Sequence, residues 1–501
     1  MDRRNFLKKS AVSIGAFGLS NELASVLYAA DRIKPPNILW LVAEDLCPDL
    51  ACYGAKLVKT PHLDKLAQDG ARYTHAFSTS PVCSPARSAL MTGMYQTSLA
   101  SHQHRTQNKK PLPEPIKLYT DYFRSAGYYI TNSRMNMTAP GKTDFNFQVD
   151  KPFDGTDWRD RKPGQPFFSM VNFQETHRKF KRDPDNPIDP DKVKLPPYYP
   201  DHPLTRRDWA DYLECVQVLD KKVGQILQRL QENGLTEDTL VLFFGDHGRP
   251  HVRGKQWLYD GGIHIPLIFR WPGHIEPGTI VDDLISAIDL GPTCLQAAGI
   301  DTPKHLQGRN FLGENVKKRD YIIAARDRCD ETCDRIRCVR TKRYKYFRNF
   351  FPNLPYTQTN LYKSRSYPVL ALMHVLYAQG KLTPTQEKFM ASHRPAEELY
   401  DLQKDPHELN NLADDKNQQS VLTQMRQTLD NWINETNDEG EISEDPKIAA
   451  DNYLKIHLPN HNRNLQRMGL KPDATWNDWL AYWEKQLLGK NQENKPYLQK
   501  G

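Results

Sequence analysis

Apolar runs without polar alternation recur through the N-terminal part of the chain. There are five of them: NILWLVA (37–43), GYYITNS (127–133), PFFSMVNF (166–173), TLVLFFG (239–245) and HIPLIFR (264–270). Such runs are typical of strands that are buried on both faces, as in a parallel sheet. The pattern therefore predicts at least five strands of a mostly parallel sheet.

Helical patterns separate these runs. TPHLDKLAQDG (60–70) and YLECVQVLDKKVGQILQRLQENG (212–234) place apolar residues at helical spacing, and Gly234 ends the second, amphipathic helix. The resulting β-α-β order is typical of the α/β class, in which helices cover a parallel sheet. Later, RCVRTKRYKYFRN (337–349) alternates as an antiparallel strand does.

Acidic residues and a histidine follow two of the predicted strands. Glu44 and Asp45 come after the first strand, and Asp246 and His247 follow the run at 239–245. The carboxyl ends of parallel strands form the ligand crevice of such sheets, so these pairs are expected to converge. One such pair alone would be explained as a helix cap. Three carboxylates without cysteine favour a hard divalent cation, calcium first, and His247 leaves magnesium or manganese open.

The stretch PVCSPARSALMTG (81–93) places one cysteine where a helix is expected to begin. Ser84 is predicted to cap this helix, Pro85 suits its first turn, and Gly93 closes it. A helix N-terminus favours negative charge, and Arg87 lies one turn after Cys83. A cation, a helix N-terminus and an arginine together indicate a site for phosphate or sulfate chemistry.

The charge of the chain is only slightly basic. Its 68 basic and 61 acidic residues give a formal net charge of +7 over 501 residues. The surplus suits an anionic substrate, but it is spread out and forms no basic stripe, so we expect no nucleic-acid partner. No segment after the N-terminus is apolar and long enough to predict a transmembrane span.

The N-terminus begins MDRRNFLKKS and continues into a modestly apolar run that ends at Ala29 and Ala30. Arg3 and Arg4 before such a run are similar to a twin-arginine export signal, which we predict over residues 1–30. The alternative is a disordered basic tail. The signal implies the twin-arginine export machinery as a partner and a periplasmic or secreted protein.

Eight cysteines are present, and an exported protein can oxidise some of them. Cys47 with Cys52, or Cys329 with Cys333, are the pairings that sequence proximity allows. The run CDETCDRIRC lacks the paired spacing and the fourth ligand of a structural zinc site. Cys83 has no obvious local partner.

With these residues assembled, the chain resembles the type I sulfatases. Cys83-Ser84-Pro85-Ala86-Arg87 matches their C-x-P-x-R signature, whose cysteine is oxidised to formylglycine. The resemblance extends from about Pro36 to Ala413 and includes TPHLDKLAQDGARYTHAF, FFGDHG and ELYDLQKDPHELNNLA. It implies an alkaline-phosphatase-like α/β fold, with a catalytic domain over 35–316 and a smaller α+β domain over 317–501, which carries a small antiparallel sheet and a helical tail.

The resemblance also implies roles for individual residues. The implied metal ligands are Glu44, Asp45, Asp246, His247 and the formylglycine at Cys83. The implied catalytic residues are Cys83, Arg87, Lys142, His177 and Lys255. One position departs from the family: Asp144 stands where a histidine is usual, and we expect His102 or His104 to fill its place. A sulfatase-maturating or formylglycine-generating enzyme is the implied partner in maturation.

Within this family the chain is most similar to heparan N-sulfatases and their bacterial relatives. RDRCDETCDRIRCVRTKRYKYFRNFFPNLPY (326–356) carries that likeness, and from it we expect Arg326, with Asp327 and Asp330, to contact a sugar. A charged face of a small sheet is the alternative for these residues. The aromatic helix DATWNDWLAYWEKQLLGK is expected to pack onto the domain rather than to bind sugar.

The sequence therefore predicts a sulfatase that acts on a sulfated polysaccharide or glycosaminoglycan fragment. Cleavage of the S–N bond of N-sulfoglucosamine is an alternative, as is a phosphodiesterase or phosphonate monoester hydrolase of the same fold. The remaining alternative is a non-catalytic carbohydrate-binding protein, in which Cys83 stays a thiol.

Overall fold

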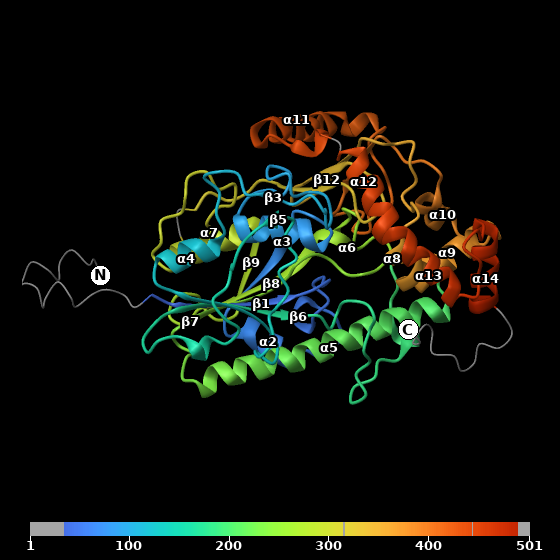
Figure 1. Ribbon diagram of the computed structural model, residues 1–501. Helices are drawn as coiled ribbons and strands as arrows, with labels where there is room; N and C mark the ends of the chain where they lie inside the picture. Colours follow the sequence, from blue (N-terminus) through green and yellow to red (C-terminus); the bar gives the residue numbers. More distant parts are fainter. Residues whose placement is uncertain (1–34, 314–315, 443, 489–501) are drawn as a thin grey trace, which may run out of the picture. The chain divides into compact units, whose positions relative to one another are not determined.

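The computed structural model describes residues 35–313, 316–442 and 444–488 (Figure 1). The predicted signal peptide over residues 1–30 lies outside these ranges. Within the described ranges, none of the helices combines the length and the apolar character needed to cross a bilayer.

A seven-stranded sheet with the order β4-β6-β1-β7-β8-β2-β9 forms the centre of the protein. Its strands are β1 (Asn37–Ala43), β2 (Ala71–Phe77), β4 (Tyr129–Arg134), β6 (Phe167–Phe173), β7 (Thr239–Gly245), β8 (His264–Arg270) and β9 (Thr279–Ser286). All five predicted strands are present, and β4, β6, β1 and β7 are parallel. β8 is antiparallel to both of its neighbours, although its apolar run resembles those of the parallel strands, because burial on both faces and not direction produces that pattern.

The sequence pattern missed two strands of this sheet. β2 has the sequence ARYTHAF and alternates buried with half-buried positions. β9 has the sequence TIVDDLIS, whose first five positions are at most half buried. Neither offers a continuous apolar run, since both lie toward the β9 edge of the sheet, where less of the strand is covered.

Helices cover both faces of the sheet. Successive side chains of β1 point to opposite faces, so each face presents apolar residues that a helix layer buries. Leu39, Leu41 and Ala43 pack with α2 (Pro61–Gln68) and α5 (Pro203–Glu232). Ile38, Trp40 and Val42 pack with the helices of the other face, which are α3 (Cys83–Thr92), α4 (Tyr119–Ser125) and α7 (Leu290–Ala297). Figure 1 shows the two layers on either side of the strands.

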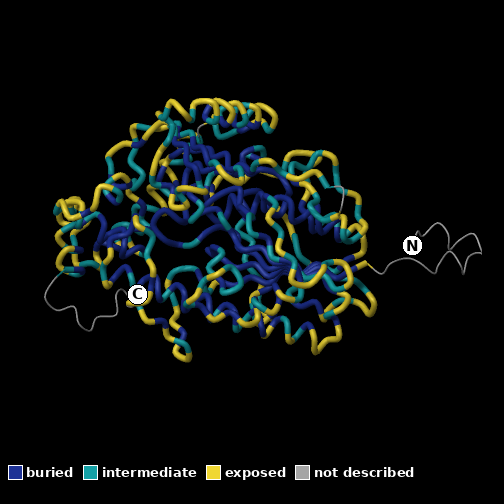
Figure 2. The backbone as a smooth tube through the Cα atoms, turned by 180° about the vertical axis from the view of Figure 1, so that it is seen from behind, coloured by how far each residue is buried: buried dark blue, intermediate teal, exposed yellow. Residues whose placement is uncertain are grey.

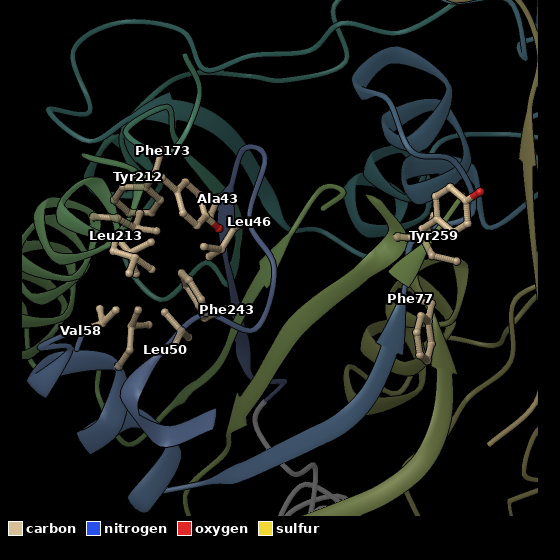
Figure 3. Close-up of a cluster of buried hydrophobic side chains, with 14 of the residues drawn as sticks. Ala43, Leu46, Leu50, Val58, Phe77, Phe173, Tyr212, Leu213, Phe243 and Tyr259 are labelled. Atoms are coloured by element: carbon tan, nitrogen blue, oxygen red, sulfur yellow. The ribbon is translucent and has the colours of Figure 1, made fainter. Parts of the chain in front are cut away.

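The apolar layer between the sheet and α5 is visible at close range in Figure 3. Tyr212 and Leu213 of α5 approach Phe173 of β6 and Phe243 of β7, and all four are buried. Seen from behind in Figure 2, the strands form a dark, buried centre under more exposed helices and loops. The sheet is therefore a rigid base, and its strand ends present the polar residues that follow them.

A second, four-stranded antiparallel sheet follows in the chain. Its strands are β10 (Ile322–Arg326), β11 (Ile336–Arg340), β12 (Tyr344–Asn349) and β13 (Glu397–Asp401), paired in that order. The alternation noted in the sequence corresponds to the β11–β12 hairpin. Helix α11 (Gln419–Thr436) packs Leu422, Met425 and Leu429 against this sheet.

The remaining elements are short helices and one small sheet. They are β3 (Lys110–Pro111) with β5 (Phe147–Gln148), α6 (Asp260–Ile263), α8 (Leu361–Ser366), α9 (Pro368–Ala378), α10 (Pro384–Met390), α12 (Pro446–Asn452), a π-helix (Tyr453–His457), α13 (Leu458–Arg467) and α14 (Trp476–Leu488). Single 3₁₀ turns occur at Ala51–Tyr53, Trp158–Asp160, Pro190–Lys192, Ala287–Asp289, Lys416–Gln418 and Glu439–Glu441.

The eight cysteines are all free thiols, and seven of them are buried or half-buried. The pairings of Cys47 with Cys52 and of Cys329 with Cys333 are therefore not formed. Cys47, for example, donates to the carbonyl oxygen of Gly261 at 3.2 Å instead.

Helix α14 packs on α9, as expected for its aromatic sequence. Trp479 and Trp483 are buried among Ala371, Leu372 and Val375. This packing holds the end of the described chain against the rest of the protein.

We expect Trp483→Ala to destabilise the docking of α14 by about 3 kcal/mol, because it removes a large buried side chain. Trp476→Ala is the matched control, since Trp476 is 48% exposed and Trp483 only 3%; a surface truncation should cost under about 1 kcal/mol. Thermal unfolding and protease sensitivity of the C-terminal helix measure both. Equal effects from the two substitutions would contradict the packing described.

Candidate functional site

The register of two parallel strands brings the predicted acidic residues together. Ala43 of β1 lies opposite Gly245 of β7, so the residues that follow each strand are neighbours. The backbone N–H of Asp45 donates to Asp246 Oδ1 at 3.0 Å, and His247 Nε2 lies 3.2 Å from Asp45 Oδ1. Asp45 has a left-handed φ of 54°, a conformation that non-glycine residues keep mainly at functional sites.

Cys83 is the first residue of α3 and is fully buried at this strand edge. Its Sγ lies 3.2 Å from His247 Nε2. Burial alone would raise the pKa of the Cys83 thiol. The positive charges of Lys142, Lys255 and His247 lower this pKa by more than burial raises it, so the net shift is downward. The position of the expected nucleophile therefore favours a negative charge.

The start of α3 differs in detail from the prediction. Val82, in an extended conformation, is the N-cap, and Ser84 and Pro85 lie inside the first turn. The Ser84 hydroxyl does not cap the helix, because it bonds His104 Nδ1 at 2.9 Å and accepts the N–H of Arg105 at 3.0 Å. Gly93, with φ of 70°, ends the helix as expected.

Three cations balance the three carboxylates of the site. Arg87 Nε lies 3.0 Å from Asp246 Oδ2, and Lys142 Nζ lies 2.8 Å from Glu44 Oε2. Lys255 Nζ lies 2.9 Å from both oxygens of Asp45. Buried charges are stable only when they are paired, and each of the three carboxylates here has one cationic partner.

Two polar atoms of this cluster remain without a partner. Glu44 Oε1 and Arg87 Nη2 are buried and have no hydrogen bond within the described part of the chain. Buried polar groups are nearly always satisfied, so an unsatisfied acceptor and an unsatisfied donor in one cluster indicate ligands of opposite charge.

The residues present fit a hard divalent cation. Ligand atoms of Asp45, Cys83 and His247 lie within 4.8 Å of one another, as do those of Glu44, Asp45 and His177. Burial lowers the pKa of His247, but Asp246, Cys83 and Asp45 outweigh it and raise the pKa to about 9, which reports a strongly negative environment. Carboxylate oxygens in such a field are suitable ligands for calcium or magnesium. A cation there would compete with Lys142 and Lys255 for the same oxygens.

His177 follows β6 and lies beside this cluster. Its Nδ1 lies against the carbonyl oxygen of Arg178, which assigns the proton to Nδ1 and leaves Nε2 for exchange. Burial and the charge of Lys255 lower the pKa of His177. Arg178 is itself fixed by two bonds to Asp208, at 2.7 and 2.6 Å.

A cavity of about 400 Å³ opens above Cys83. Five of the residues singled out in the sequence line it, namely Cys83, His104, His177, Lys255 and Asp330. His102 does not line it and is buried near Asp327. Of the two histidines considered for the vacant family position, only His104 therefore reaches the cavity. Burial lowers the pKa of His104 to about 3, so this imidazole is neutral.

Asp144 does not act as a substitute for that histidine, because its carboxylate is already engaged. Arg105 binds it at 2.8 Å through Nη2, and Lys142 Nζ lies 3.7 Å away. Asp144 therefore fixes Arg105, which lines the cavity, and sequence inspection did not single out Arg105.

Arg326 does not line the cavity, so the expected sugar contact is not supported. It is the last residue of β10, it is 2% exposed, and its Nη1 lies 2.8 Å from Asp334. Asp327 likewise pairs inward with Arg337 at 3.1 Å. Of the three residues considered in this stretch, only Asp330 reaches the cavity wall.

Comparison with known proteins assigns the family. The sulfatase profile matches residues 36–300, which is more than half of the chain. The chain belongs to the sulfatase family. A second profile, described as the C-terminal part of N-sulphoglucosamine sulphohydrolase, matches residues 245–394.

Two sequence relatives of this sulfatase cover most of its length. It is 34% identical to an ulvan-active sulfatase of Formosa agariphila, over 86% of this chain and 79% of the other. It is 27% identical to human N-sulphoglucosamine sulphohydrolase, over 81% of this chain and 91% of the other.

Solved structures share its fold, which is the alkaline-phosphatase-like α/β fold with a small antiparallel sheet. A protein solved in complex with its substrate D-glucosamine-2-N,6-O-disulfate superposes with a TM-score of 0.59 at 16% identity, over 82% of this chain and all of the other. A phosphonate monoester hydrolase of Silicibacter pomeroyi gives 0.58 at 18% identity, over 80% and 95%. The fold alone therefore does not choose between sulfur and phosphorus chemistry.

We expect a divalent cation to stabilise this sulfatase, by about 2.7 kcal/mol at a hundredfold excess over its dissociation constant. Glu44→Gln should remove most of that gain, because it deletes a ligand charge without changing the shape of the side chain. Melting temperatures with calcium, magnesium or manganese against a chelator measure the effect. Asp282→Asn, at an exposed position, is the control; a wild-type melting temperature that no ion raises would contradict the assignment.

Proposed function

We propose that this sulfatase hydrolyses a sulfate ester of a sulfated carbohydrate, with a formylglycine derived from Cys83 as its nucleophile. One observation carries the proposal: the buried cluster around Cys83 holds an unsatisfied donor, Arg87 Nη2, and an unsatisfied acceptor, Glu44 Oε1. The donor suits a sulfate oxygen and the acceptor suits a cation. The carbohydrate is inferred from the names of the two sequence relatives.

The groups implied by the family supply the nucleophilic chemistry. A hydrated aldehyde at position 83 supplies an oxygen nucleophile and a second hydroxyl for releasing sulfate, and a divalent cation, calcium in our proposal, supplies a Lewis acid beside it. Glu44, Asp45, Asp246 and His247 are the residues that we assign to hold the cation, with the oxygen of residue 83.

Three cationic side chains bind the sulfate oxygens in this proposal. Arg87 offers its unsatisfied Nη2, and Lys142 and Lys255 offer ammonium groups that now contact Glu44 and Asp45. Donors fixed before the reaction stabilise the charge that develops on the equatorial oxygens at no reorganisation cost. His177 Nε2, with Lys255, delivers the proton to the departing sugar oxygen.

Charge counting supports a singly charged substrate. Glu44, Asp45 and Asp246 cancel Arg87, Lys142 and Lys255, so a divalent cation that His247 binds in its neutral form leaves two positive charges. One ionised nucleophile and one sulfate ester neutralise them, whereas a phosphate monoester dianion exceeds them. Buried sites of this kind favour the neutral sum.

Maturation and export complete the proposal. We propose that residues 1–30 direct twin-arginine export to the periplasm or beyond, and that a sulfatase-maturating enzyme oxidises Cys83. We also propose a boundary between the catalytic domain (35–316) and the C-terminal domain (317–501). Residues on both sides of that boundary line the cavity, which supports substrate binding between the two.

Activity and mass together test the function. We expect the mature protein to release sulfate from an aryl sulfate, and the peptide that contains Cys83 to be about 18 Da lighter than its thiol form. Cys83→Ala should lower turnover by at least about 10⁴-fold, because it removes the nucleophile. Faster turnover of the matching aryl phosphate, or an unmodified peptide in an active protein, would overturn the proposal.

A second candidate, cleavage of the S–N bond, is favoured by the profile match over residues 245–394. Product analysis on heparin and ulvan oligosaccharides separates the two candidates. Loss of N-sulfate alone would replace the ester with the sulfamate as the substrate.

We expect His177→Gln to slow release of a sugar leaving group by about 10²-fold or more, because general acid catalysis contributes that much to a poor leaving group. An aryl sulfate with an acidic phenol needs little protonation, so its turnover should fall far less. The ratio of the two rates is the measurement. Equal losses on both substrates would assign His177 to sulfate binding instead of proton transfer.

A further inference from the structure

The C-terminal helices contribute one wall of the active-site cavity. Asn452, Ile456, His457 and Asn460 line the same cavity as Cys83, although they lie more than 350 residues later in the chain. They also lie beyond both matched family segments, which end at residues 300 and 394. This wall therefore lies outside the segments that the two profiles match.

Polar contacts and packing fix the position of this wall. Glu444, just before α12, accepts from Arg328 Nε at 2.5 Å and from the Thr106 hydroxyl at 3.1 Å. Arg328 also donates to the carbonyl oxygen of His104 at 3.3 Å, so the wall is connected to the loop that carries His104. Further along, α13 packs beside α8, and α14 packs on α9. The labels α12, α13 and α8 can be followed in Figure 1.

A π-helical turn sets the residues that face the cavity. The segment Tyr453–His457 joins α12 to α13, and π-helical bonding runs from residue i to residue i+5. Asn452 and His457 are five residues apart, so the turn aligns them on one face, and Asn460 follows one turn later. Such turns occur often at functional sites because they re-aim side chains.

Two groups on the cavity surface have unused binding capacity. Arg365 of α8 is exposed and forms no ion pair or hydrogen bond within the described residues, unlike Arg105 and Arg328, which are paired. Asn452 is only 7% exposed, and its Oδ1 has no hydrogen-bond partner in the described chain. An unpaired guanidinium and an unsatisfied amide that line the same cavity indicate a ligand with both an anionic group and hydroxyl groups.

Asp330 and Glu331, the acidic residues of the cavity, form no ion pair with Arg365 in the described chain. Asp330 faces His104 at 3.6 Å, and Glu331 faces His457 at 3.5 Å and accepts the N–H of Leu361. The cationic charge of Arg365 is therefore available to a ligand. A cavity of about 400 Å³ exceeds the space of a sulfate group alone and so has room for sugar residues as well.

We propose that Arg365 and the C-terminal helical wall form a subsite for an anionic group on the sugar residue next to the one that carries the scissile sulfate. Arg365 binds the carboxylate or second sulfate of that sugar, and Asn452, His457 and Asn460 bind its hydroxyl groups. The subsite rests on the proposed carbohydrate sulfatase function and sets which polymer the enzyme accepts.

Binding to the inactive Cys83→Ala chain tests the subsite separately from catalysis. Calorimetry with heparin and ulvan tetrasaccharides compares this chain with its Arg365→Ala derivative, and we expect about tenfold weaker binding, the loss of one charge-assisted contact. Asn460→Ala should weaken binding about threefold if the helical wall contributes hydroxyl contacts. Arg467→Ala is the matched control: Arg467 lies on α13, the helix of Asn460, but outside the cavity, so this substitution should leave the affinity unchanged.

Carboxyl-reduced and desulfated heparin tetrasaccharides identify the anion. The form whose loss of charge reproduces the effect of Arg365→Ala carries the group that Arg365 binds. Equal affinity of the Arg365→Ala and parent chains, equal effects of Arg365→Ala and Arg467→Ala, or no binding of any tetrasaccharide would overturn the proposal. Aryl sulfate turnover by the unsubstituted enzyme reports on the proposed function separately, so the two failures can be distinguished.

Discussion

The parallel pairing of β1 with β7 is the constraint on which the rest of the site depends. It places Glu44 and Asp45 beside Asp246 and His247 at one buried edge, where uncompensated carboxylates would be very costly. The surrounding chain compensates with cations from three separate segments. Helix α3, the loop at residue 142 and the loop at residue 255 each deliver one, so the nucleophile helix and both lysine loops are positioned by the same electrostatic requirement.

The central strands and the charged cluster could be predicted because their signals are local. A buried strand is an uninterrupted apolar run, and the C-x-P-x-R motif is contiguous. The direction of β8 could not be predicted, since burial on both faces produces the same run in either direction. The side chain of Ser84 bonds His104, a residue 20 positions away, so its local capping pattern was misleading. The ion pair of Arg326 with Asp334 could not be predicted either, because ion pairing inside a small sheet leaves no periodic pattern in the sequence.

The cavity combines two parts of the chain with different tasks. Its floor comes from strand ends and from α3, where the chemistry requires fixed charges. One wall comes from α8 and the C-terminal helices. These helices are held by packing on α9 and by the contact of Glu444 with Arg328, and neither interaction involves the charged cluster. Changes in this wall can therefore alter the accepted polymer while the charge balance around Cys83 stays intact. No pattern in the sequence marked Asn452 or Arg365, because only the fold brings them to the cavity.

The internal pairing of Lys142 with Glu44 and of Lys255 with Asp45 has a consequence for the order of assembly. Each ammonium group neutralises its carboxylate, so side chains of the polypeptide compensate the charge of the strand ends. A cation bound to these carboxylate oxygens would free both ammonium groups, and of the two only Lys255 lines the cavity. Binding of a cation would then increase the affinity of the site for an anion.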